Sequence, residues 1–147
     1  MSTVPTLEAS LFAAFPQVQV RGVIAPHECE ECDALRQVLG RVTWDAVPPE
    51  FIRENDGSLP LLSQEAYVTF LPAWLREALR DPSGLVAGQL LVNLRHEPRT
   101  DGFTQPQSSV IVDIARFIAN SNVWGSNDPV NVESLAAIES AWGAHAA

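Results

Sequence analysis

Reactive side chains are densest in one short segment, which reads HECEECD over residues 27–33. Imidazole and thiolate groups are preferred ligands of Zn²⁺, so His27, Cys29 and Cys32 are candidate zinc ligands. A closed structural zinc site needs a fourth ligand, and the sequence has no second C-x-x-C motif to provide one. The candidates for that fourth position are His96, His145 and Asp33.

Two other interpretations of this segment stay open. A C-x-x-C pair near a helix N-terminus is typical of thiol–disulfide chemistry, because the helix dipole stabilises a thiolate. The neighbouring glutamates oppose that effect, since negative charge raises the pKa of a thiol. In the third interpretation, Cys29 and Cys32 are small core residues in helical phase with Leu35, and His27 only helps to set the start of the helix. We expect this last arrangement, because it needs no further assumption.

Trp124 is a candidate for partner binding. It lies in a loop over residues 120–131 that is otherwise rich in Asn, Ser, Gly and Asp. Aromatic side chains dominate the binding energy of many interfaces, and loops often carry function, so Trp124 could anchor a protein partner. The alternative is that Trp124 folds back over the core, which is the usual outcome for so large a side chain.

Motifs of nucleophilic catalysis and of nucleotide binding are missing from the sequence. There is no G-x-S-x-G nucleophile motif and no glycine-rich phosphate-binding loop. A hydrolase with an unrecognised site is therefore only an alternative. A deep pocket lined by His96 or His27 beside a carboxylate would favour it.

The charge of the chain excludes several classes of partner. The 147 residues include 18 acidic and 9 basic side chains, so the formal net charge is 9 − 18 = −9 at pH 7. Binding to nucleic acid needs clustered Lys and Arg, and an anionic membrane surface would repel this chain. No apolar run approaches the roughly 18–20 residues of a transmembrane helix, and the first residues lack a secretion signal. We therefore expect a cytoplasmic protein with no nucleic-acid or membrane partner.

Size and patterning predict the fold class. With 46% hydrophobic residues, a chain of this length can bury a full core, and we expect a single helical domain over residues 1–147. Proline and glycine divide the sequence into helix-length pieces, which predicts a compact all-α bundle of six or seven helices. Residues 18–24 alternate briefly between apolar and polar side chains, so one short extended segment is an option there, although no partner strand is evident.

Local signals delimit the individual helices. Proline fits the first helical position and glycine often ends a helix, so the helix that carries the cysteines is predicted to run from Pro26 to Gly40. Ser63 is a natural N-cap for the longest helix, expected at residues 64 to about 80, in which Pro72 predicts a kink or a junction of two helices. Thr104 opens another helix by its capping-box spacing from the following glutamine. The remaining helices are expected at about residues 5–15, 49–54, 85–94 and 132–145, where 85–94 could instead be a strand but has helical neighbours.

Three further groups of residues follow the cysteine segment in a fixed order. They are Trp44 with the run PPE at 48–50, the run LPLLSQEAY at 59–67 and the run FLPAW at 70–74. With HECEEC at 27–32, they make residues 26–82 resemble a family of small bacterial proteins that is catalogued as a domain of unknown function. The resemblance implies an intracellular bacterial protein and transfers no activity or site. Residues 120–131 have no counterpart in the family pattern.

Acidity, small size and the lack of a catalytic motif favour a non-enzymatic interaction protein that binds a basic partner. An acidic inhibitor of the immunity-protein type is one example. The alternatives are a small metal- or thiol-dependent protein built on His27, Cys29 and Cys32, and the unrecognised hydrolase. We expect no cofactor unless the first alternative holds, in which case zinc is the candidate.

Overall fold

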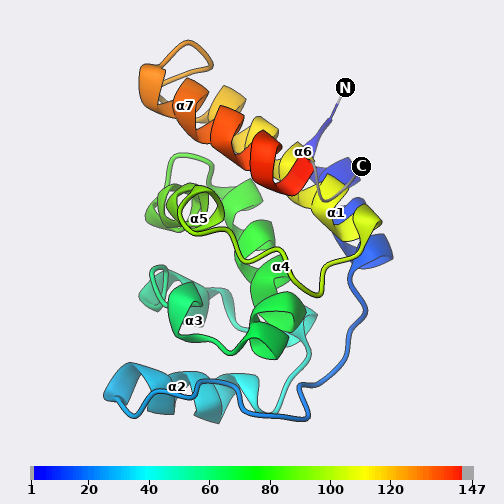
Figure 1. Cartoon of the computed structure of the whole chain (residues 1–147), viewed down its shortest axis with the longest axis vertical. Helices are drawn as coiled ribbons and strands as arrows, with labels where there is room; N and C mark the ends of the chain where they lie inside the picture. The colour runs from blue at the N-terminus through cyan, green and yellow to red at the C-terminus, as the bar shows by residue number, and fades with distance from the viewer. Residues whose placement is uncertain (1, 144–147) are drawn as a thin grey trace.

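The computed structural model describes residues 2–143, which form seven α-helices and three short helical turns without a β-strand. This confirms the all-α prediction. Helix α4 crosses the middle of the molecule, with α2 at one end and α6 and α7 at the other (Figure 1). The elements are α1 (Val4–Ala14), α2 (Glu30–Leu39), η1 (Trp44–Ala46), α3 (Pro49–Glu54), η2 (Leu59–Leu61), α4 (Gln64–Arg80), α5 (Leu85–Arg95), α6 (Gln105–Ser121), α7 (Pro129–Ile138) and the π-helical η3 (Glu139–Gly143).

Polar side chains start several helices at the positions that the sequence indicates. Before α4, the Ser63 hydroxyl oxygen accepts a backbone N–H of the first turn at 3.1 Å. Before α6, the N–H of Gln107 donates to Thr104 Oγ1 at 3.3 Å and the N–H of Thr104 donates to Gln107 Oε1 at 2.9 Å. Thr3 and Thr6 form the same kind of capping box before α1. Each box satisfies backbone donors that a helix start otherwise leaves unpaired.

The core is one cluster of buried apolar side chains, drawn from segments that run from α1 to η3. Helix α4 lies at its centre and packs against α1, α3, α5 and α6. Trp44, Trp74 and Trp142 are fully buried, and each donates its indole N–H to a backbone carbonyl. Large aromatic side chains whose polar atom is satisfied contribute strongly to stability.

Several predicted boundaries differ from the structure. Helix α2 begins at Glu30 instead of Pro26. Residues 18–24 form no strand, because the described residues offer no second strand to pair with. Helix α4 continues through Pro72 and is not divided into two helices, whereas residues 85–94 are helical as favoured.

The C-terminal helix also begins earlier than expected. Asp128 caps α7 by accepting the N–H groups of Val130 and Asn131, so the helix starts at Pro129, and residues 139–143 form a π-helical turn. His145 lies outside the described residues. None of the helices in residues 2–143 combines the length and the apolar character needed to cross a bilayer.

Candidate metal centre

The start of α2 determines where the first cysteine lies. Cys29 is the N-cap, with an extended backbone, and its Sγ accepts the N–H of Cys32 at 3.3 Å. A helix from Pro26 would place both thiols on the apolar face. Cys32 is fully buried, in agreement with that prediction, and Cys29 is half-buried at the helix end, where it packs against the core.

His27, Cys29 and Cys32 converge on one point. The N-cap and the third helical residue face each other across the first turn, so the two sulfurs are neighbours. The imidazole of His27 lies beside the two sulfurs, and one ligand atom from each of the three residues lies within 4.8 Å of the other two. In a tetrahedral zinc site, ligand sulfur and nitrogen atoms stand about 3.5–3.8 Å apart. Small side-chain rotations would therefore bring all three onto one ion.

The two thiols have opposite pKa shifts. The pKa of Cys29 is lowered, mainly by the hydrogen bond from the Cys32 thiol and then by hydrogen bonds from His27 and from the backbone N–H of Cys32. The pKa of Cys32 is raised to about 11, because its thiol donates to Cys29 and because it is buried. Cys29 is thus the cysteine of the pair that deprotonates more readily to a thiolate, and Cys32 keeps its proton at neutral pH.

Arg36 fixes the backbone that carries His27. Its Nη1 donates to the carbonyl oxygen of Ala25 at 2.6 Å and to that of His27 at 3.1 Å, while Nη2 donates to Asp33 Oδ1 at 2.5 Å. Hydrogen bonding to Asp33 raises the pKa of Arg36, so the guanidinium stays charged. Upstream, the same loop is hydrogen-bonded to Ser63 at the start of α4. No motif in the sequence marks this role of Arg36, because the groups that it holds in the loop are backbone carbonyls.

Acidic side chains surround the cluster. The exposed members are Glu28, Glu30, Glu31 and Asp33. One of them is held in place, since Glu31 Oε2 accepts a hydrogen bond from the hydroxyl of Ser58 at 3.2 Å. Negative charge at this end of the molecule attracts cations and opposes a free thiolate, so it favours a metal ion over an isolated anionic sulfur.

The chain supplies three ligands to this point, not four. Within residues 2–143, the only group of three or more potential ligand side chains is His27, Cys29 and Cys32. Asp33 is engaged by Arg36, and His96 ends α5 in a different part of the fold. Three protein ligands with an open fourth position define an exchangeable or reactive metal site more readily than a closed structural one.

Trp124 is on the surface. Its side chain is 64% exposed, so the alternative in which it folds back over the core is wrong. Exposure leaves Trp124 able to contact a partner, but nothing in the fold identifies that partner. The interaction-protein hypothesis remains a prediction.

A pocket is present beside His96. It has a volume of about 260 Å³, and its lining includes the carboxylates of Asp56 and Glu97. Glu97 is the one non-glycine residue with positive φ (50°) within residues 2–143. The lining contains no serine, threonine or cysteine to act as a nucleophile. The pocket thus places an imidazole and two carboxylates along one hollow, the arrangement that favours the hydrolase alternative, and that alternative remains a prediction.

No protein-family model matches the chain, and no curated protein or solved structure shows significant similarity to it. The resemblance of residues 26–82 to a bacterial family thus stays a prediction.

Proposed function

We propose that this protein binds a transition-metal ion, with Zn²⁺ as the first candidate, through His27, Cys29 and Cys32. The observation that carries the proposal is the convergence of one nitrogen and two sulfur ligand atoms within 4.8 Å. Two thiolates and an imidazole are a donor set that selects zinc or copper(I) over hard cations such as Mg²⁺ or Ca²⁺.

The surroundings of the cluster support an exchangeable site. The imidazole of His27 is exposed and Cys29 is half-buried, so an ion can reach the ligands from solvent. The fourth coordination position is left to water or to a donor from another molecule. Such a site suits the uptake and transfer of a metal ion, because ligand exchange can proceed through the open position.

Arg36 acts as a positioning residue in this proposal. It does not contact the ion, but it ties the carbonyl groups of Ala25 and His27 to α2 and so sets the distance between the imidazole and the two sulfurs. Outer contacts of this kind commonly change metal affinity by about 10–100-fold.

The test is a competition titration of the reduced protein with Zn²⁺ against a chromophoric chelator. We expect one ion per chain. The sharpest variant is Cys29→Ser, because serine is a preferred N-cap and preserves the start of α2 while removing the thiolate. His27→Ala is matched by His96→Ala, which removes an exposed imidazole that is not part of the cluster. Cys29→Ser and His27→Ala should each weaken binding by about tenfold or more, and His96→Ala should not.

A Co²⁺ titration reports the ligands directly. Thiolate coordination gives charge-transfer absorption, which should be present in the parent protein and reduced in Cys29→Ser. Absence of stoichiometric binding by the reduced protein, or equal losses in His27→Ala and His96→Ala, would overturn the proposal.

Thiol–disulfide exchange is a second candidate function, favoured by the opposite pKa shifts of the two thiols. In that reaction the Cys29 thiolate attacks a low-molecular-weight disulfide and releases one thiolate. Cys32 then loses its proton and attacks the Cys29 sulfur of the mixed disulfide, which releases the second thiolate and leaves a Cys29–Cys32 disulfide.

Equilibration with reduced and oxidised glutathione separates the two functions. A disulfide that forms reversibly in a protein that takes up no metal would favour the redox function. Stoichiometric metal uptake by the reduced protein would favour the metal function. Two thiols that neither oxidise nor bind metal would exclude both.

A further inference from the structure

Trp124 is held on the surface by a network of buried polar groups. Asn122 Nδ2 donates to Asn131 Oδ1 at 3.0 Å, and Asn131 Nδ2 donates to Asn122 Oδ1 at 2.8 Å. Asn122 Oδ1 also accepts the backbone N–H groups of Trp124 and Gly125, both at 3.2 Å. Gly125 has φ 82°, a conformation that favours glycine. The exposure of Trp124 is therefore a property of a hydrogen-bonded turn and not of a loose loop.

The surface beside Trp124 is hollowed into a cavity of about 250 Å³ between α5 and α7. Leu91 and Val130 contribute apolar lining, and the indole of Trp124 forms part of the wall. Arg95, the last residue of α5, also lines the cavity. An apolar hollow with a few polar groups at its edge is the usual form of a small-molecule site.

Arg95 lacks the partners that such a side chain normally has. Its Nε is buried without a hydrogen-bond partner, and no carboxylate within residues 2–143 forms an ion pair with it. Asp128 lines the same cavity, but its Oδ2 already accepts two backbone N–H groups at the start of α7. Among the other eight arginines, four pair with carboxylates, namely Arg36, Arg53, Arg80 and Arg116, and Arg76 and Arg99 donate to backbone carbonyls instead.

The geometry points to a binding site for a small aromatic carboxylate in the cavity lined by Trp124 and Arg95. The carboxylate would take the guanidinium as its partner, an arrangement that gives strong charge-assisted hydrogen bonds. The aromatic body would lie against the indole and the apolar lining. A volume of about 250 Å³ suits a ligand on the order of a dozen non-hydrogen atoms.

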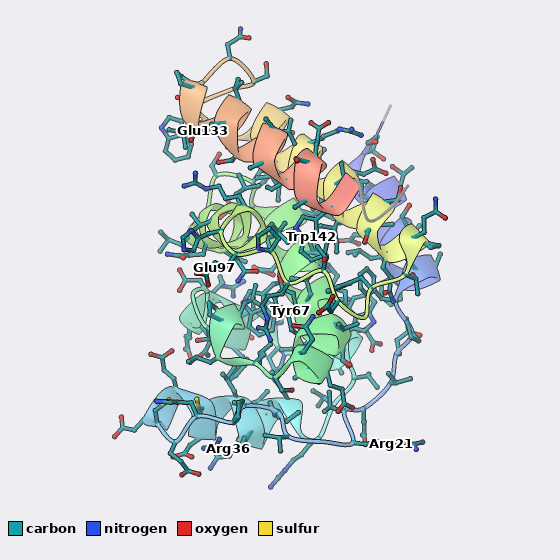
Figure 2. The ribbon with its side chains drawn as sticks, in the orientation of Figure 1. Arg21, Arg36, Tyr67, Glu97, Glu133 and Trp142 are labelled. Atoms are coloured by element: carbon teal, nitrogen blue, oxygen red, sulfur yellow. The ribbon has the colours of Figure 1, made fainter. Side chains whose placement is uncertain are left out.

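This site is independent of the metal centre. Figure 2 shows Arg36 on α2 at the opposite end of the molecule from Glu133 on α7, the helix that borders the cavity. A failure of metal binding would therefore not contradict the carboxylate site, and a failure of carboxylate binding would not contradict the metal site.

The test uses 2-naphthoate and its uncharged isostere 2-naphthamide, titrated separately into the full chain and followed by amide chemical shifts and calorimetry. We expect saturable shifts in the turn around Gly125 and at least about tenfold tighter binding of the carboxylate, as one charge-assisted contact provides. Arg95→Gln should remove that tenfold preference, and Trp124→Ala should weaken binding of both compounds. Arg41→Gln, a change at an exposed arginine next to α2, is the matched control and should alter neither.

The comparison of the two compounds needs no variant, so it holds even if Arg95→Gln fails to fold. Equal affinity of the parent protein for naphthoate and naphthamide would overturn the inference. So would shifts that do not saturate, or that appear away from the loop, α5 and α7.

Discussion

Zinc binding should tighten steeply with pH, and Cys32 should set the steepness. Metal coordination needs the thiolate, so the proton of Cys32 must leave before or during binding. With a pKa of about 11, only about one Cys32 side chain in 10⁴ is deprotonated at pH 7. Each rise of one pH unit below that pKa multiplies the competent fraction by about ten, so the apparent affinity should rise about tenfold per unit from this thiol alone.

Cys29 contributes differently because its pKa is lowered. A group with a lowered pKa is already deprotonated at lower pH. Above its pKa it releases no proton when the metal binds, so it no longer contributes to the pH dependence of the affinity. The slope of log affinity against pH should therefore be largest at acidic pH and approach one proton, that of Cys32, at alkaline pH.

The assay is the chelator competition repeated between pH 6 and 8, with the chelator calibrated at each pH. Cys32→Ala supplies the comparison, since it removes the proton in question and replaces a buried thiol by a smaller apolar group. Its slope should fall by less than one proton, because loss of the Cys32 thiol also removes the hydrogen bond that lowers the pKa of Cys29; the slope of His96→Ala should match that of the parent protein. A parent affinity that does not change with pH, or a zinc affinity that Cys32→Ala leaves intact at a fixed pH, would refute the assignment of Cys32 as a ligand.

Three other perturbations test separate parts of the structure. Arg36→Met should lower zinc affinity by about tenfold, because it releases the backbone of His27, and should leave the helix content measured by circular dichroism unchanged. A clear loss of helix content in this variant would argue against a positioning role. Asn131→Ala should cost about 2–3 kcal/mol in denaturant unfolding, since it leaves a buried amide unpaired, whereas Asn127→Ala at an exposed position should cost less than about 0.5 kcal/mol. Thr104→Ala should cost about 1 kcal/mol through loss of the capping box, and no change in unfolding midpoint would contradict the importance of that cap.

The parts of the fold that the sequence predicted are those with local causes. Ser63 and Thr104 cap the helices that follow them because their oxygens need only reach N–H groups in the next turn. The bounds 49–54 and 64–80 are confirmed for the same reason, since proline and polar caps act within a few residues. Such signals need no knowledge of the rest of the chain.

The errors arose where distant groups decide the conformation. Pro26 is a helix-start signal, but the backbone around it is hydrogen-bonded to Arg36, several turns later, and the residues before it to Ser63, far along the chain. Trp124 has the size of a core residue, yet the paired amides of Asn122 and Asn131 hold the loop in a form that exposes it. Arg95 could not be distinguished from the other arginines, because an absent partner leaves no mark in a sequence.

The four-residue error at the start of α2 changes the chemistry of the whole segment. Counted along a helix from Pro26, the cysteines share an apolar face and have no distinct roles. With the helix starting at Glu30, the same C-x-x-C spacing becomes that of an N-cap and the third helical residue, the spacing at which Thr3 and Thr6 place their hydroxyl oxygens 3.0 Å apart before α1. In α1 this capping geometry satisfies backbone donors, and in α2 it brings two sulfurs together at the positive end of the helix. The loop before the N-cap places the imidazole of His27 beside the two sulfurs. The same residues therefore form the cap and the proposed metal site, because the sulfur that accepts a backbone N–H still has lone pairs for an ion.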